Sequence, residues 1–330
     1  EASQANDSSF DSEELLGLGF ASFHRGRNSR AEGYFRESLK MFEKSGDMHG
    51  KATALGCLGT VAQRIGEYEE ARELFGESLR IGQDLEDKQL ISYGLGEMGM
   101  TELASGNFAE AEKLISESLA IKNEDPEGFD QSAFASSLNN LGLLYHNTSR
   151  LKEAEELYSR SLEFKNTPAS IVTTIMNIAS IRLQRGDFLG ATELYFQGLG
   201  ICREEGLRFH EGGAMKCIGD VFFEMNDFET AMDHYIESLV IMEETGNRLD
   251  EARTRINLAN ALISLHDLPG AERELTLSEK IYKELRSSRD RDTLDMAWAS
   301  LHYHRKEFAE AKERLEKILS EVEENTITEA

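Results

Sequence analysis

A period of about 40 residues recurs along almost the whole chain and limits what this sequence can fold into. The unit is clearest over residues 137–162, SLNNLGLLYHNTSRLKEAEELYSRSL, which predicts two amphipathic helices joined by a tight turn. Each helix has one apolar face at helical spacing, formed by Leu138, Leu141 and Tyr145 on the first and by Ala154, Tyr158 and Leu162 on the second.

One alanine on the second helix marks each copy of the unit. Successive markers are 40, 40, 43, 37, 40, 40 and 40 residues apart. We therefore predict an all-α fold, a right-handed α-solenoid superhelix of eight helix-turn-helix repeats over residues 13–320, with polar tails at residues 1–12 and 321–330. The markers are Ala31, Ala71, Ala111, Ala154, Ala191, Ala231, Ala271 and Ala311.

Small residues on the first helices predict close packing within each pair. Gly59 and Gly99 are examples, and a larger side chain there would push the two helices apart. The turn five residues before each marker favours a left-handed helix end. Gly26 and three other glycines suit this conformation, whereas His266 and Lys306 do not, which predicts a looser array toward the C-terminus.

Two irregular stretches explain the two unequal gaps. KNEDPEGFDQ, Lys122–Gln131, is an insertion between repeats three and four, and repeat five begins early after Lys165–Pro168. The prolines fall at predicted helix boundaries, and Pro269 suits the first turn of a helix.

Charge and cysteine content restrict the partners and the compartment. A net charge of −25 disfavours polyanions, so we predict no nucleic-acid partner and no membrane partner. Three distant cysteines, Cys57, Cys202 and Cys217, predict a reducing interior and a cytoplasmic location. The chain begins with Glu1, so both a processed form and a piece of a larger polypeptide with further domains remain open.

The order of leucine, small residue, aromatic, alanine and aromatic within a unit resembles the tetratricopeptide repeat family. It is present as Leu141-Gly142, Tyr145, Ala154 and Tyr158, and the resemblance covers residues 13–320. The long unit is similar to the extended repeats of kinesin light chains, LGN-type adaptors and MalT-like bacterial regulators. The resemblance implies that the first helices line a concave groove that binds extended peptides or partner helices.

No motif in the sequence predicts catalysis. There is no phosphate-binding glycine loop, no nucleophile motif and no metal-type cluster. His302 and His304 are two residues apart, so on a helix they point to nearly opposite sides and cannot chelate one ion. We therefore predict no enzyme activity, no catalytic residue, no metal and no cofactor.

Three asparagines, Asn140, Asn177 and Asn257, precede the apolar-small pair in repeats four, five and seven. Asparagine is a poor helix-interior residue, and its amide can donate to and accept from the backbone of an extended ligand. Similar columns occur in the LGN and kinesin light chain groups, although Glu97 interrupts this one. The alternative interpretation is that these asparagines are polar residues that face solvent and contact no ligand. The predicted groove residues, chiefly in repeats four to seven, are Asn139, Asn140, His146, Asn147, Asn177, Lys216, Asp220, Arg253, Asn257 and Asn260.

Two classes of function fit these sequence features. The first is a non-catalytic protein-interaction scaffold that holds a peptide or partner segment in the groove. The second is a ligand- or peptide-sensing regulatory domain of a larger signalling protein, such as a transcription regulator or a signalling ATPase. A subunit that gates a catalytic partner is a third class, for which no sequence feature argues.

Overall fold

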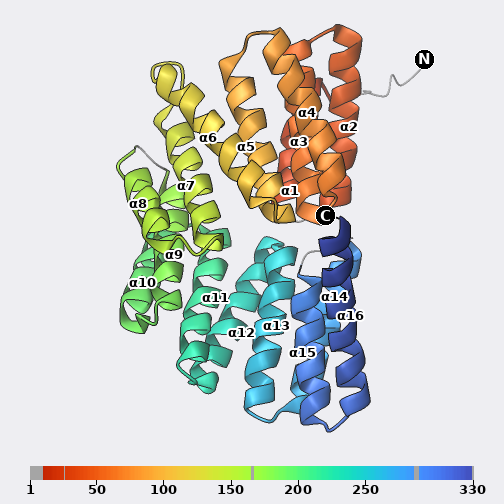
Figure 1. The fold of residues 1–330 in the computed structure, drawn as a ribbon, viewed down its shortest axis with the longest axis vertical. Coiled ribbons are helices and arrows are strands. Elements are labelled where there is room, and N and C mark those ends of the chain that lie inside the picture. The colour runs from red at the N-terminus through yellow and green to blue at the C-terminus, as the bar shows by residue number, and fades with distance from the viewer. Residues whose placement is uncertain (1–9, 26, 165–166, 286–289, 329–330) are drawn as a thin grey trace, which may run out of the picture. The chain divides into compact units, whose positions relative to one another are not determined.

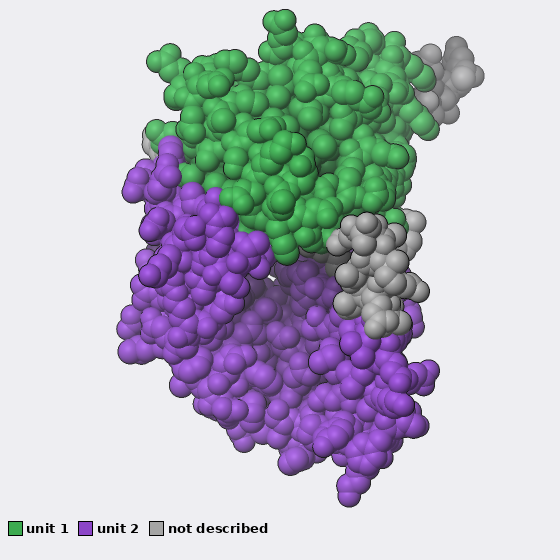
Figure 2. Space-filling view, in the orientation of Figure 1, with its two compact units in different colours: residues 1–144 green, residues 145–330 purple. Residues whose placement is uncertain are grey.

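Sixteen helices and no strand form the described part of the chain in the computed structural model, which covers residues 10–25, 27–164, 167–285 and 290–328. The chain divides into two compact units, residues 1–144 (unit 1) and residues 145–330 (unit 2), coloured separately in Figure 2. Most of the predicted N-terminal tail, and Gly26, lie outside the described residues.

The helices follow one another in antiparallel pairs, as the repeat pattern predicts (Figure 1). Unit 1 contains α1 (Ser12–His24), α2 (Asn28–Ser45), α3 (Met48–Ile65), α4 (Tyr68–Asp84), α5 (Lys88–Ser105) and α6 (Phe108–Glu124). The helix α7 (Gln131–Asn147) contains the boundary between the units. Unit 2 continues with α8 (Leu151–Leu162), α9 (Pro168–Gln184), α10 (Phe188–Glu204), α11 (Arg208–Glu224), α12 (Phe228–Thr245), α13 (Arg248–Ser264), α14 (Leu268–Leu285), α15 (Arg291–His304) and α16 (Phe308–Thr328).

The predicted insertion is shorter than the sequence suggested. Lys122 belongs to the last turn of α6, so the connection to α7 is only residues 125–130. The helix propensity of the preceding segment carries the helix through Lys122, whereas Pro126 lies in the connection. Pro168 is the first residue of α9 and Pro269 is the second residue of α14, which confirms their boundary positions.

The packing inside each pair depends on a small residue that faces a large one. A Cβ atom added at Gly59 would lie 2.7 Å from the Phe75 ring, and one added at Gly219 would lie 2.6 Å from the Tyr235 ring. The eight marker alanines are also buried, with exposed fractions between 0% and 6%. The second helix can approach this closely only because the first helix presents a hydrogen atom at that position.

A serine lies seven residues after most marker alanines, and its hydroxyl adds a hydrogen bond between the same two helices. The Ser78 hydroxyl donates to the Ala52 carbonyl at 2.9 Å, and the Ser238 hydroxyl donates to the Gly212 carbonyl at 2.7 Å. The donor and acceptor are 26 residues apart in each of these bonds, so the bond joins the second helix to the first helix of one repeat. Ser38, Ser118 and Ser278 make the same bond.

The turns within the pairs adopt the left-handed conformation even where the residue is not glycine. His266 has φ of 63° and Lys306 has φ of 66°, close to the value of 61° at Asn226. The amide of the following residue bonds back to the first helix in both turns, as in Asp267 N to Leu262 O at 2.8 Å. This cap compensates for the unfavourable backbone, so the described C-terminal pairs keep the same turn that the glycine repeats use.

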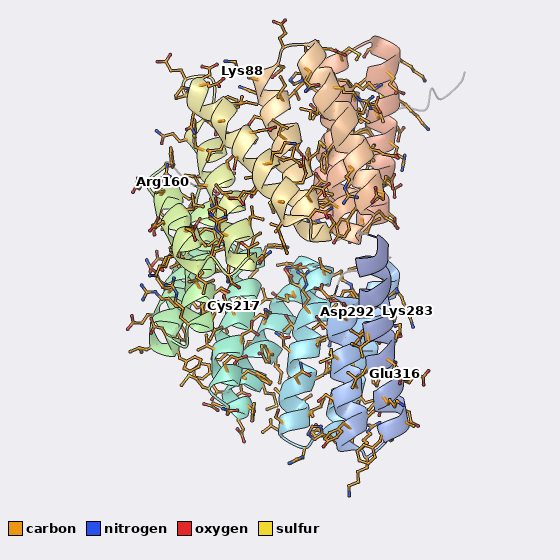
Figure 3. The ribbon with its side chains drawn as sticks, in the orientation of Figure 1. Lys88, Arg160, Cys217, Lys283, Asp292 and Glu316 are labelled. Atoms are coloured by element: carbon orange, nitrogen blue, oxygen red, sulfur yellow. The ribbon has the colours of Figure 1, made fainter. Side chains whose placement is uncertain are left out.

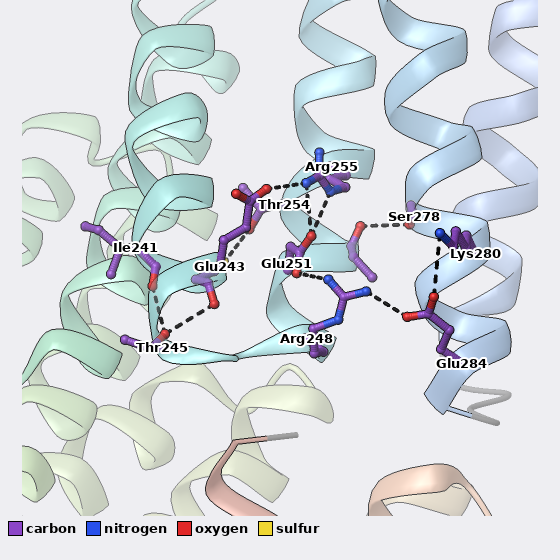
Figure 4. Close-up of polar contacts among 12 residues, drawn as sticks. Ile241, Glu243, Thr245, Arg248, Glu251, Thr254, Arg255, Ser278, Lys280 and Glu284 are labelled. Atoms are coloured by element: carbon purple, nitrogen blue, oxygen red, sulfur yellow. Dashed lines mark hydrogen bonds and ion pairs between the residues drawn. The ribbon is translucent and has the colours of Figure 1, made fainter. Parts of the chain in front are cut away.

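Arginines connect helices within and between repeats in unit 2 (Figure 4). Arg248 donates to Glu251 on its own helix and to Glu284 on α14, 2.8 Å away. The Arg255 side chain, only 10% exposed, bonds to Glu251 at 2.9 Å, to Glu274 at 2.6 Å and to Glu243 at 2.6 Å. The nearly buried Glu251 carboxylate is therefore neutralised by two guanidinium groups, which the low polarity of its surroundings requires.

Two glycine-to-alanine substitutions in unit 2 should change stability in opposite directions. Gly219→Ala places a methyl group against the Tyr235 ring and should lower the free energy of unfolding by about 1–3 kcal/mol through overpacking. Gly198 lies within α10, where an added Cβ would meet nothing closer than 3.8 Å. Gly198→Ala should therefore raise stability by about 0.5–1 kcal/mol. Urea denaturation followed by circular dichroism measures both, and equal effects would show that the register of the pairs is wrong.

The strained turn at Lys306 gives a second stability prediction. Lys306→Gly should raise the free energy of unfolding by about 1 kcal/mol, because glycine has no Cβ to oppose a positive φ. Lys306→Ala is the matched control, since it removes the same exposed side chain and keeps the strain. A glycine variant no more stable than the alanine variant in urea denaturation would contradict the prediction.

Candidate functional site

The ten predicted groove residues all lie on first helices, namely α7, α9, α11 and α13. Asn147 is exposed, and the other nine are half-buried. This position, neither in the core nor fully in solvent, is the one from which a side chain can contact a ligand.

One cavity of about 330 Å³ in unit 2 brings three of the predicted residues together. The carboxylate of Asp220 lines it from α11, and Asn257 and Asn260 line it from α13. We call it the unit 2 pocket, and its lining residues are Leu183, Asp220, Phe223, Glu224, Tyr235, Asn257 and Asn260.

Three donors from three helices hold the Asp220 carboxylate. Its Oδ1 accepts from the Tyr235 hydroxyl at 2.9 Å and from the Asn257 amide at 2.8 Å. Its Oδ2 accepts from the Lys216 ammonium at 2.7 Å. Asn257 thus has its amide group oriented by Asp220, with its carbonyl oxygen left to accept from a ligand.

The charges in this cluster stabilise one another. Burial opposes the charge on Lys216, but the adjacent Asp220 carboxylate outweighs it and raises the pKa of Lys216. Burial, followed by Asp220, raises the pKa of Tyr235, so the phenol remains a hydrogen-bond donor. Cys217 lies on α11 (Figure 3) and follows Lys216 in the sequence, and burial raises the pKa of its thiol to about 11. This cysteine is therefore a neutral thiol rather than a nucleophile.

The remaining predicted residues lie outside the unit 2 pocket. His146 Nε2 is 3.1 Å from the Gln184 side-chain oxygen, and Arg253 pairs with Asp290 at 2.7 Å and with Asp250 at 3.3 Å. Arg253 thus serves an ion-pair network, although the sequence predicted a ligand contact. Asn139, Asn147 and Asn177 line neither described pocket.

Sequence reasoning missed four lining residues: Leu183, Phe223, Glu224 and Tyr235. Glu224 was detectable, because it follows Asp220 by four residues and so shares its helical face. Tyr235 is a buried core residue, and its hydroxyl donates to Asp220 at the pocket.

A second cavity, of about 350 Å³, lies in unit 1 among α5, α6 and α7. It contains Asn140 and also Glu97, the residue that interrupts the asparagine column. We call it the unit 1 pocket, and its lining residues are Gln89, Ser92, Tyr93, Gly96, Glu97, Ser118, Lys122, Phe129, Asp130, Ala133, Ser136, Ser137 and Asn140.

Two charged groups of opposite sign line the unit 1 pocket. Burial raises the pKa of Glu97 to about 7 and lowers the pKa of Lys122 to about 8, with no further cause for either shift. In the described part of the chain neither group has an ion-pair partner. The pKa shifts of Glu97 and Lys122 are therefore caused by desolvation, and no neighbouring opposite charge offsets them.

Two other observations concern the described residues. No group of three or more His, Cys, Asp or Glu side chains there is arranged to hold a metal ion. No helix there is long and apolar enough to cross a membrane.

Comparisons with known proteins agree with this architecture. The family model for the tetratricopeptide repeat matches residues 11–84 and 90–167. No curated protein matches the chain.

Several solved structures share the fold. A Rap protein complexed with competence and sporulation factor has a TM-score of 0.66 at 15% identity, over 83% of this chain and 75% of that one. The Rap conjugation gene regulator of plasmid pLS20, in complex with the Phr* peptide, has a TM-score of 0.66 at 13% identity, over 87% and 80%. A signal-transduction ATPase from Pyrococcus horikoshii with a tetratricopeptide repeat sensor has a TM-score of 0.60 at 15% identity, over 97% of this chain and 49% of that one. At these identities the likeness shows the fold alone.

The raised pKa of Glu97 predicts a pH-dependent stability. A carboxyl group whose folded pKa is raised stabilises the fold below its ordinary pKa of 4.5, and this contribution is lost as the pH rises through about 7. Wild type and Glu97→Gln should therefore be similar near pH 5, and the variant should be the more stable of the two near pH 8.

Urea denaturation of both proteins at the two pH values measures this difference. Glu117→Gln, which removes one charge from an exposed position on α6, corrects for the change in net charge. A difference between wild type and Glu97→Gln that does not grow with pH would show that Glu97 is solvated.

Proposed function

We propose that the chain, which matches the family model for the tetratricopeptide repeat over residues 11–84 and 90–167, is a non-catalytic scaffold that binds a peptide or partner segment in a concave groove. Binding is chiefly through repeats four to seven. The observation that carries this proposal is the unit 2 pocket, where Asp220 orients the Asn257 amide beside the apolar side chains of Leu183 and Phe223.

This arrangement suits a peptide backbone. An oriented side-chain amide can bond to one peptide unit, while neighbouring apolar side chains accept a ligand side chain. One of the two similar Rap structures holds competence and sporulation factor and the other holds the Phr* peptide, which supports a peptide ligand for this chain. A cytoplasmic location and the absence of catalytic activity are part of the proposal.

A regulatory role is the second candidate. The Pyrococcus ATPase carries its repeat array as a sensor, and this chain spans about half the length of that protein. In such a protein the array binds a ligand and a separate domain gives the output. The two candidates differ in whether the binding event is passed to a separate domain, and only the sensor also accommodates a small-molecule ligand.

A displayed random-peptide library tests the scaffold proposal. Peptides selected on the wild-type chain should bind the Asn140→Ala/Asn177→Ala/Asn257→Ala variant about tenfold more weakly or worse, because each lost side-chain hydrogen bond contributes about 1 kcal/mol. Fluorescence anisotropy measures the affinities, and circular dichroism verifies that the variant folds.

The matched control is a triple alanine variant of exposed second-helix residues, Glu156, Glu193 and Arg273, which should bind like wild type. Equal loss in both variants would place binding outside the groove. No selected peptide, together with thermal stabilisation by the low-molecular-mass fraction of a deproteinised extract, would favour the sensor.

A further inference from the structure

The unit 1 pocket holds an ammonium group that the described part of the fold leaves without a counter-ion. The Lys122 side chain is 7% exposed, and its Nζ donates to the Ser137 hydroxyl at 2.8 Å and to the Ser118 hydroxyl at 3.1 Å. An ammonium has three donors, and the third has no acceptor among the described residues. Its other neighbour is the Phe129 ring, 5.7 Å from Nζ.

The serine hydroxyl groups near Lys122 also form hydrogen bonds with each other's backbone. The Ser118 hydroxyl donates to the Ser92 carbonyl at 2.7 Å, and the Ser92 hydroxyl donates to the Ser118 carbonyl at 3.1 Å. These neutral groups fix the position of the ammonium but do not neutralise it. A buried cation of this kind is costly unless an anion joins it.

The connection between α6 and α7 forms part of the pocket wall. Phe129 and Asp130 line the pocket from this segment. Gln89 on α5 anchors the segment by donating to the Gly128 carbonyl at 3.0 Å, and Lys88 lies 3.6 Å from Asp125. The extra residues that lengthen this repeat thus contribute to a cavity. Asp130 forms no ion pair with Lys122 among the described residues, and its Oδ1 accepts from the Ser132 hydroxyl and the Ala133 amide at 2.7 Å.

Glu97 supplies the opposite charge at the same cavity. Its carboxylate is half-buried and forms no ion pair or side-chain hydrogen bond within the described ranges. In the same ranges Glu97 and Lys122 do not pair with each other. Glu97 and Lys122 are therefore two charged lining groups of opposite sign without an ion-pair partner among the described residues, and Asp130 is a third charged group, which caps α7.

We propose that the unit 1 pocket binds a small zwitterion, a free amino acid or a dipeptide, with its ammonium at Glu97 and its carboxylate at Lys122. The volume of about 350 Å³ is at the lower end of the range for ligand pockets, which suits a ligand of this size. The Tyr93 and Phe129 rings provide apolar surface for a ligand side chain. The site is distinct from the unit 2 pocket and does not depend on peptide binding there.

Thermal-shift assays with each proteinogenic L-amino acid and each glycyl dipeptide test the proposal. At least one of these probes should raise the melting temperature of the wild-type chain. The strongest is then measured by calorimetry beside its N-acetylated and C-amidated forms, and each modification should weaken binding about tenfold or more, because each removes one charge-assisted contact. A free amino acid and a dipeptide are distinguished by which of them binds more tightly.

Two variants assign the two ends of the ligand. Lys122→Met should bind the free acid and the amide equally, whereas Glu97→Gln should bind the free amine and the acetylated form equally. Lys122→Met should fold at least as stably as wild type, because it removes a buried charge. Lys113→Met, at an exposed position on the same helix, should keep the wild-type preferences.

Proton exchange on binding is an independent readout. Near pH 7 the ligand ammonium should displace a proton from Glu97, whereas near pH 8 the ligand carboxylate should draw a proton onto Lys122. Calorimetry in buffers of different ionisation enthalpy should therefore show release at the lower pH and uptake at the higher one. The other titratable lining groups do not change charge there, since burial raises the pKa of Tyr93 and the Ser132 hydroxyl lowers the pKa of Asp130.

The proposal is overturned if no probe raises the melting temperature, or if the best probe binds no more tightly than its two capped forms. The Asn177→Ala/Asn257→Ala variant separates this result from the peptide proposal. It leaves the unit 1 pocket intact and should bind the zwitterion like wild type, whatever happens to peptide binding.

Discussion

The contact between a small residue on one helix and a ring on the next is the constraint on which the structure depends. Where Gly59 faces Phe75 and Gly219 faces Tyr235, the backbones approach closely enough for the Ser78 and Ser238 hydroxyls to reach a carbonyl on the partner helix. Apolar packing and a buried hydrogen bond therefore require the same helix separation. The serine bond recurs in most repeats, and each repeat needs to fit only its nearest neighbours.

Much of the fold was predictable because the small residues that allow this contact recur at a fixed spacing in the sequence. The marker alanines are buried, and the paired helices follow one another as the period predicts. The left-handed turns at His266 and Lys306 could not be predicted from their residue types, because a backbone cap stabilises both turns. Propensity describes a residue alone, whereas the turn is stabilised by the helices on both sides of it.

The candidate sites were only partly predictable. The repeat pattern predicted that Asp220, Asn257 and Asn260 share the ligand-facing side of first helices, but it could not show that Tyr235 and Lys216 would meet at one carboxylate. Those contacts depend on the rotamers of side chains up to 37 residues apart. Lys122 was assigned to an insertion by its polar neighbours, and only the extent of α6 reveals it as a buried group.

The arginine bridges between repeats have a consequence for cooperativity. Arg36 on α2 pairs with Glu70 on α4 at 3.1 Å, and Arg305 at the end of α15 pairs with Glu272 on α14 at 2.6 Å, so each pair joins two neighbouring repeats. Both contacts are open to solvent, so dissolved ions screen them, whereas the glycine-ring contacts inside a repeat are unaffected. High ionic strength should therefore weaken the coupling between neighbouring repeats by a small amount. The apolar clusters that join repeats, such as Tyr235 with Leu258, keep the repeats coupled.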